Sequence, residues 1–189
     1  EELQSYFSLK INKDSKLYDS FLMGKLMFML IGINFKDMIL AKESDIHDGR
    51  LIYSRAKTKT IYSIKLLPQA LQILGHFKGR DKITLLGKIT EPEMEDKIRF
   101  PLVIRQKNKV FNTHLSEIGK MIDCKEKLRG YVFRYTWANI ARQLGYSKEM
   151  IGQALGHSSN TVTDIYLNDF NPELIDKMNE QIIHKVMEQ

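Results

Sequence analysis

The 189-residue chain is predicted to form one mostly helical α+β domain with a small three-stranded antiparallel sheet. Three observations predict this class. Apolar residues recur at helical spacing over most of the chain, a strong hairpin signal at Asp48-Gly49 interrupts them, and the composition of 43% hydrophobic and 28% charged residues is that of an ordinary globular domain. No internal repeat or low-complexity linker divides the sequence, so we expect residues 1–189 to form a single domain.

Residues 1–39 are predicted to be helical because Leu22, Leu26 and Leu30 recur at the spacing of one helix face. Asn34 marks a break before a new short helix. The period changes after Asp45, which is where the sheet is expected to begin.

Three short segments predict the sheet. Asp48-Gly49 is a two-residue turn signal between Ile46 and the run 51–53. A second reversal at 57–59 leads into the apolar run 61–64. We therefore expect three antiparallel strands joined by two tight connections.

The rest of the chain is predicted to be helical, apart from residues 80–103, which have no clean period and are expected to be irregular or to hold one short helix. Pro68 begins a helix that Gly79 ends, and apolar stripes predict amphipathic helices over 111–122 and 133–144, the latter ended by Gly145. The helix signals that follow are a cap at Ser147, a left-handed terminus at Gly156, and Asn171-Pro172 at the start of a final amphipathic helix.

Charge and cysteine content limit the class of protein. The net charge of +6 and the pI near 9.2 favour an acidic partner. Cys124 is the single cysteine, which excludes an intramolecular disulfide and a thiol metal cluster and suggests a reducing, intracellular compartment. No apolar run is long enough to span a bilayer, and no secretion signal opens the chain, so no membrane partner is expected.

Candidate chemistry lies in the last third of the chain. Tyr131 and Arg134 are three residues apart on a predicted helix, so we expect them to project from one flank, beside the apolar stripe. His157 follows Gly156, and Tyr166 comes nine residues after His157. Arginine, histidine, tyrosine and lysine, without a carboxylate pair or metal-ligand spacing, suit metal-free phosphoryl transfer. Taken singly, Arg134 could be a surface cation or a helix-packing ion pair, His157 a solvated imidazole and Tyr166 a half-buried ring.

The joint pattern Tyr131-Val-Phe-Arg134, Leu155-Gly-His157 and Tyr166 resembles the C-terminal half of tyrosine recombinases, the phage-integrase-like family that includes integrases of conjugative and mobilisable elements. The resemblance implies the catalytic-domain fold of that family. It also implies that Lys57 is the hairpin lysine and that Asp37 and Asp45 form an acidic pair in the first sequence box. A DNA-clamping helical domain would then precede this one, outside residues 1–189.

By this resemblance Tyr166 is the nucleophile that forms a 3′-phosphotyrosine and releases a 5′-hydroxyl. Arg134 and His157 would hold the nonbridging phosphate oxygens, and Lys57 would protonate the leaving oxygen. No cofactor and no metal are implied. Tyr131 stands where the family usually has histidine; it keeps a hydrogen-bonding hydroxyl but cannot act as an imidazole base.

One departure concerns the first catalytic arginine, because its place falls on Asn34 or Ile31. Losing one charge-stabilising group typically costs about 10² to 10³ in rate. The protein would then be a slow enzyme, a degenerate one, an engineered one, or one in which a cation from elsewhere replaces the arginine. Lys36 and Arg55 are the candidates for that cation because they are near in sequence. A DNA-binding module with little or no catalysis is the alternative function, and a type IB topoisomerase is a third.

The implied partner is double-stranded DNA in a prokaryotic cytoplasm, with the protein associated with the nucleoid. Phosphate contacts are expected from Arg55, Lys59, Lys127 and Arg129 among a larger basic set, although any of these could belong to a solvated face. The other members of the set are Lys57, Arg99, Arg105, Lys107, Lys109 and Lys125. The helix after Pro172 either docks on a neighbouring protomer of a tetramer on DNA or packs on its own domain.

Overall fold

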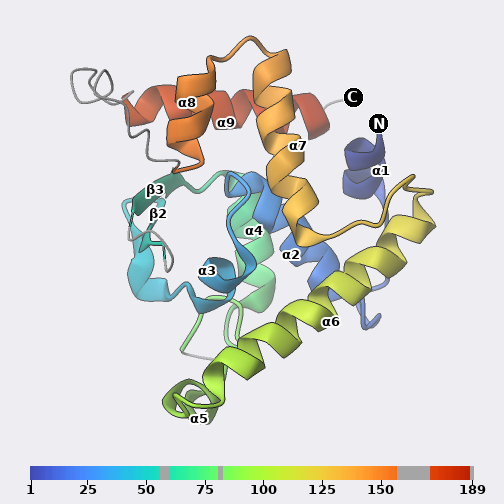
Figure 1. The fold of residues 1–189 in the computed structure, drawn as a ribbon, viewed down its shortest axis with the longest axis vertical. Helices are drawn as coiled ribbons and strands as arrows, with labels where there is room; N and C mark the ends of the chain where they lie inside the picture. Colours follow the sequence, from blue (N-terminus) through green and yellow to red (C-terminus); the bar gives the residue numbers. More distant parts are fainter. Residues whose placement is uncertain (56–59, 81–82, 157–170, 188–189) are drawn as a thin grey trace.

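The structure is a computed structural model that describes residues 1–55, 60–80, 83–156 and 171–187 (Figure 1). It confirms a mostly helical chain with one three-stranded antiparallel sheet of order β1-β2-β3. The helices are α1 (Glu2–Ser8), α2 (Tyr18–Met29), α3 (Phe35–Leu40), α4 (Pro68–Phe77), α5 (Glu91–Glu95), α6 (Phe100–Met121), α7 (Gly130–Gln143), α8 (Lys148–Ala154) and α9 (Pro172–Met187), and the strands are β1 (Ile46–His47), β2 (Arg50–Ser54) and β3 (Ile61–Lys65). A 3₁₀ helix, Glu43–Asp45, precedes β1. None of the described helices is both long and apolar enough to cross a membrane.

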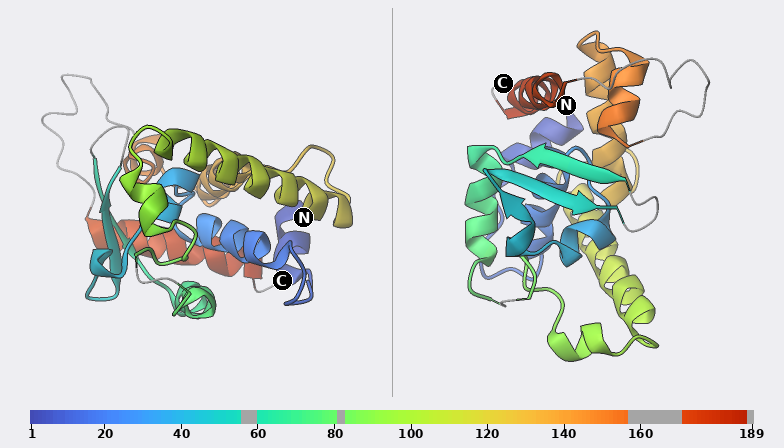
Figure 2. Two further views of the ribbon diagram at one scale, coloured as in Figure 1. Left: turned by 90° about the horizontal axis from the view of Figure 1, so that it is seen from below. Right: turned by 90° about the vertical axis from the view of Figure 1, so that its left-hand side faces the viewer.

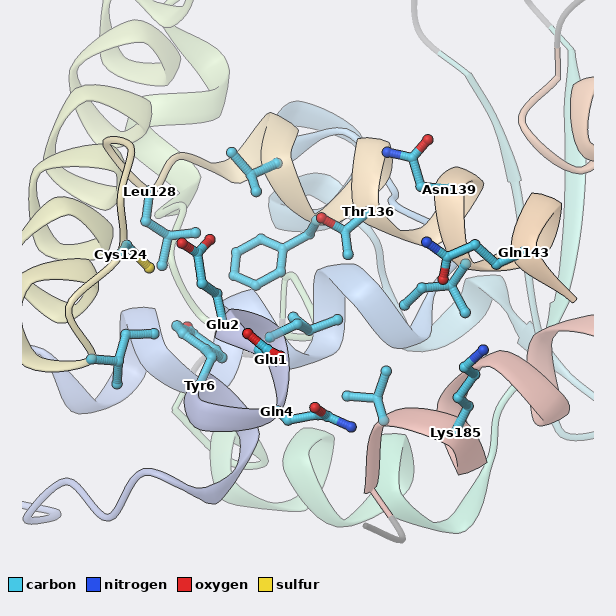
Figure 3. Close-up of a pocket in the computed structure, with 16 residues that line it drawn as sticks. Glu1, Glu2, Gln4, Tyr6, Cys124, Leu128, Thr136, Asn139, Gln143 and Lys185 are labelled. Atoms are coloured by element: carbon cyan, nitrogen blue, oxygen red, sulfur yellow. The ribbon is translucent and has the colours of Figure 1, made fainter.

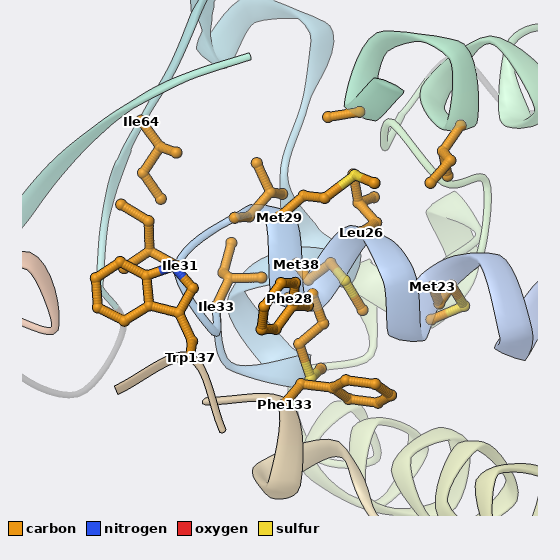
Figure 4. Close-up of a cluster of buried hydrophobic side chains, with 14 of the residues drawn as sticks. Met23, Leu26, Phe28, Met29, Ile31, Ile33, Met38, Ile64, Phe133 and Trp137 are labelled. Carbon is orange, nitrogen blue, oxygen red and sulfur yellow. The ribbon is translucent and has the colours of Figure 1, made fainter. Parts of the chain in front are cut away.

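Helix α2 is the centre of the core. Eight of its twelve residues are buried, and it packs against α4, α6 and α7. Figure 4 shows side chains of α2 in one buried cluster with Ile33 and Met38 and with Phe133 and Trp137 of α7. Gly24 permits a close approach of α1, because a Cβ there would lie 2.2 Å from the Tyr6 hydroxyl oxygen.

The sheet covers one side of the helical body (Figure 2). Its first turn has the expected form: Asp48 and Gly49 have φ of 48° and 72°, the left-handed pair that a two-residue hairpin turn requires. Strands β2 and β3 pair Leu51 with Ile64 and Tyr53 with Tyr62. The second reversal falls on residues 56–59, outside the described part of the chain.

The segment 80–103 is more regular than predicted. Helix α5 begins at a capping box in which the Thr90 amide donates to Glu93 Oε2 at 2.9 Å. Helix α6 begins at Phe100, eleven residues before the apolar stripe that predicted it. Its fully buried residues, such as Phe111 and Leu115, lie in the C-terminal half, whereas in the first half Val103 and Ile104 are only partly buried and Leu102 is exposed.

Helix α9 packs on its own domain. Met178, Ile182 and Val186 are buried on its inner face. Two ion pairs join α9 to the sheet: Arg50 binds both carboxylate oxygens of Asp176, at 2.6 and 3.0 Å, and Lys65 Nζ lies 2.8 Å from Glu180 Oε1. Of the two predicted arrangements, this chain on its own adopts self-packing.

Candidate functional site

Arg134 is buried, contrary to the expectation that it would project beside the apolar stripe of its helix. Its side chain is 7% exposed and belongs to the inner face of α7 together with Phe133 and Trp137, whereas Tyr131 is 73% exposed. Arg134 and Tyr131 therefore lie in different environments. The burial of a guanidinium is permitted here because backbone carbonyls accept its hydrogen bonds.

The carbonyls that accept from Arg134 come from two distant segments. Nη1 donates to the Gly32 carbonyl at 3.0 Å, and Nη2 donates to the Leu155 carbonyl. Gly32 has φ of 62°, and a Cβ there would lie 2.4 Å from Arg134 Cα, so only glycine fits. Arg134 thus joins the α2–α3 connection to the end of α8.

The end of α8 is also held by the hairpin. The Tyr62 hydroxyl donates to the same Leu155 carbonyl at 2.6 Å. Gly156 has the predicted left-handed conformation, with φ of 62°, and a Cβ there would lie 1.9 Å from Tyr62 Oη. The backbone is therefore tightly placed at the residue that precedes His157.

The other predicted catalytic residues, Lys57, His157 and Tyr166, lie outside the described residues, as does Lys59. Of the described residues closest in sequence to Lys57 and His157, Arg55 follows β2 and Gly156 packs on Tyr62 of β3. The hairpin and the end of α8 meet at this place.

Arg55 contacts Asn34. One end of the Asn34 amide lies 3.2 Å from both Nε and Nη2 of Arg55 and 3.4 Å from Asp37 Oδ2. We assign the amide oxygen to that end because two N–H groups of the guanidinium point at it and a guanidinium can only donate. Ile31 occupies a different environment: its side chain is 3% exposed and lies in the core beside Trp137 (Figure 4). Of the two positions where an arginine was expected, only Asn34 touches a cation.

Tyr53 is the ring that connects these groups. It stacks on Tyr62 with ring centroids 5.1 Å apart and an angle of 12° between the planes. Burial raises the pKa of the Tyr53 hydroxyl far above its ordinary value, and the nearby Tyr62 and Asp37 raise that pKa further. The positive charges of Arg134 and Arg55 act on the same pKa in the opposite direction. The raised pKa keeps the Tyr53 hydroxyl protonated, so it can donate a hydrogen bond.

Sequence reasoning did not select Tyr53 and Tyr62. The available signal was their symmetry about the second reversal of the hairpin, which makes them directly opposed in the register of β2 and β3. Aromatic pairs in sheets are usually structural, so position alone did not mark them as part of a site.

The exposed basic residues predicted to contact DNA include Lys127 and Arg129, which directly precede α7. The exposed rings of Tyr131 and Tyr135 follow on the first turns of that helix. Cations next to exposed aromatic rings suit contact with a nucleic-acid backbone and sugars.

A cleft of about 370 Å³ lies elsewhere, between α1, α7 and α9 (Figure 3). Its polar lining includes Glu2, Thr136, Asn139 and Lys185, and it contains none of the predicted catalytic residues. No cluster of three or more histidine, cysteine, aspartate or glutamate side chains suited to a metal ion occurs among the described residues.

Comparison of the chain with protein-family models, with curated proteins and with solved structures finds no match. The functional assignment therefore depends on the residue pattern and on the geometry of the site.

Proposed function

We propose that the chain is a DNA strand transferase that cleaves and rejoins DNA through a phosphotyrosine intermediate, in the manner of the tyrosine recombinases its sequence resembles. One observation carries the proposal. The Arg134 guanidinium and the Tyr62 hydroxyl of the hairpin both donate to the Leu155 carbonyl, and Gly156, which packs on Tyr62, immediately precedes His157. A cationic site with neutral hydroxyl donors suits the charge that develops on a transferring phosphoryl group.

In the proposed reaction the Tyr166 oxygen bonds to phosphorus and the bond from phosphorus to the 5′ oxygen breaks. Lys57 gives its proton to that oxygen, which leaves as a hydroxyl, and the Tyr166 proton passes to a base. Rejoining reverses these steps with a 5′-hydroxyl as the attacking group. The number of phosphoester bonds is unchanged, so no external energy source is needed.

The described tyrosines of the site are poor nucleophiles, which supports the choice of Tyr166. The Tyr62 hydroxyl already donates its proton to the Leu155 carbonyl. The pKa of Tyr53 is raised far above its ordinary value by burial, so its phenolate is scarce at neutral pH. Both rings instead suit positioning and hydrogen-bond donation.

A trapping experiment tests the proposal. The protein is incubated with a pool of nicked duplexes of randomised sequence, in which cleavage near the nick releases a short fragment and prevents rejoining. Wild-type protein should form an adduct that survives denaturing electrophoresis and is mapped to Tyr166 by mass spectrometry, and Tyr166→Phe should form none. DNA binding without any adduct would refute the proposal.

A DNA-binding module without catalysis is the second candidate. It is favoured by Asn34 at the expected place of an arginine and by the two backbone carbonyls that occupy Arg134. The trapping experiment separates the two, because a binding module shifts duplex DNA in a native gel but leaves no covalent product. Relaxation of supercoiled plasmid without strand exchange would instead favour a type IB topoisomerase.

Assembly on DNA is part of the proposal. Strand exchange needs two duplexes and several protomers, so we infer a tetramer on DNA. Analytical ultracentrifugation of the adduct formed in the trapping experiment would measure the number of protomers.

A further inference from the structure

We infer that Arg55, held in place by the amide of Asn34, is the cation that contacts the scissile phosphate most directly. The inference rests on the proposed function and adds a residue to its site. The juxtaposition that carries it is the Asn34 amide 3.2 Å from both Nε and Nη2 of Arg55.

The chemistry of the contact favours anion binding. An amide oxygen orients a guanidinium without neutralising it, whereas a carboxylate would cancel its charge. Arg50 and Arg80 show the second case, since they bind Asp176 and Asp19. No carboxylate of the described residues lies within ion-pair distance of Arg55. Arg55 is therefore oriented by a neutral amide rather than by a direct ion pair, and the Asp37 carboxylate lies on the far side of that contact, 3.4 Å from the amide.

Arg55 is also better placed than Arg134 to meet a large substrate. Arg134 is 7% exposed, and two of its five N–H donors already bind backbone carbonyls. Arg55 is partly exposed at the end of β2. We therefore assign Arg134 mainly to positioning the end of α8 and assign the direct phosphate contact to Arg55.

Lys36 was the other cation that could replace the absent arginine. It lies on α3 with an exposed side chain, and nothing in the described residues fixes its ammonium group near Tyr53 or Arg134. A mobile lysine loses more side-chain entropy on binding a phosphate than an arginine that is already oriented.

The substitution Asn34→Asp tests this inference directly. It is nearly isosteric and keeps a residue type favoured before the first turn of a helix, but it places a carboxylate against Arg55 and next to Asp37. We expect the rate of adduct formation to fall about 10²- to 10³-fold in protein that still unfolds cooperatively in urea. A purely structural role for Asn34 would not lower the rate while stability is kept.

Two further variants complete the experiment. Asn12→Asp is the matched control, because it adds the same charge on an exposed loop, and it should form adduct at the wild-type rate. Arg55→Gln should lose about as much rate as Asn34→Asp. Adduct rates within threefold of wild type in both site variants would overturn the inference even if the wild type forms the adduct.

Salt dependence of duplex binding gives a readout that does not require catalysis. The logarithm of the DNA association constant falls linearly with the logarithm of the salt concentration, and each lost phosphate contact should make that slope less steep by about 0.9. If the wild type forms no adduct, the proposed function fails, and the inference is judged by this slope alone. A slope unchanged in Arg55→Gln and in Asn34→Asp would overturn it.

Discussion

Asn179 joins three helices through two buried hydrogen bonds, and its removal should cost much of the stability of the fold. The side chain is 3% exposed on α9. Its Oδ1 accepts from Trp137 Nε1 of α7 at 2.8 Å, and its Nδ2 donates to the Met29 carbonyl of α2 at 2.9 Å. Met29 is the last residue of α2, so its carbonyl has no partner within the helix.

The substitution Asn179→Ala would leave the Trp137 indole N–H and the Met29 carbonyl buried without a hydrogen-bond partner. Each such group typically costs about 1 to 3 kcal/mol, which sums to roughly 2 to 6 kcal/mol. The higher helix propensity of alanine returns only about 0.5 kcal/mol. We therefore expect a loss of about 2 to 5 kcal/mol, a large part of the roughly 5 to 15 kcal/mol that stabilises a typical domain.

Urea unfolding measures this loss. Trp137 is the single tryptophan and is fully buried, so its fluorescence reports unfolding of the core. Circular dichroism of the helices provides a second signal, because the substitution changes the surroundings of the fluorophore itself. Asn108→Ala is the control: Asn108 lies on an exposed face of α6, where a change of no more than about 0.5 kcal/mol is expected.

Two results would refute the reasoning. A loss below about 1 kcal/mol would mean that water or a shifted side chain replaces both hydrogen bonds. A wild-type midpoint that rises with protein concentration would mean that α9 docks on another protomer, since packing within one chain is independent of concentration.

Three further predictions concern other parts of the structure. Gly32→Ala should lower the free energy of unfolding by about 2 to 5 kcal/mol, because the new methyl group would overlap Arg134 and the left-handed backbone would be strained. Gly49→Ala, whose methyl group would have nothing within 4 Å, should lower it by only about 1 to 2 kcal/mol, and equal urea midpoints for the two variants would contradict this. Burial alone would raise the pKa of the Asp19 carboxyl, but hydrogen bonds from two cations and a histidine lower that pKa well below its ordinary value. The stability that Asp19 contributes is therefore complete above about pH 5 and lost toward lower pH, and Asp19→Asn should flatten the acid side of the curve of unfolding free energy against pH. Tyr62→Phe should lower the free energy of unfolding in urea by about 1 kcal/mol, because the Leu155 carbonyl loses the tyrosine hydroxyl but keeps Arg134 as a donor. A loss above about 3 kcal/mol would indicate a wider rearrangement.

Local signals in the sequence predicted the ends of the elements well. Ser147 accepts from the Met150 amide at 3.2 Å and begins α8, and Gly145 and Gly156 take the left-handed conformations that end the helices before them. The hairpin turn at Asp48-Gly49 has the predicted backbone. These features depend on preferences of residues a few positions apart, so they can be read without knowing the rest of the fold.

The apolar stripes of the sequence predicted the buried part of a helix but not the part whose side chains are exposed. The apolar stripe located the second half of α6 but not its start at Phe100, because exposed residues such as Leu102 and Arg105 carry no period. The environment of Arg134 was also predicted wrongly. An arginine is normally kept out of an apolar face, and only carbonyls from residues far away in sequence make its burial possible here.

The sequence by itself determined most of the succession of helices and strands, the first turn of the sheet, and the resemblance on which the proposed chemistry rests. The tertiary structure decided which of those residues meet. Asn34 and Arg55 are 21 positions apart, and Tyr62 and Leu155 are 93 apart, yet each pair is in hydrogen-bond contact. Such contacts form because the core brings distant segments together, and a buried polar group must take whichever partner that packing supplies.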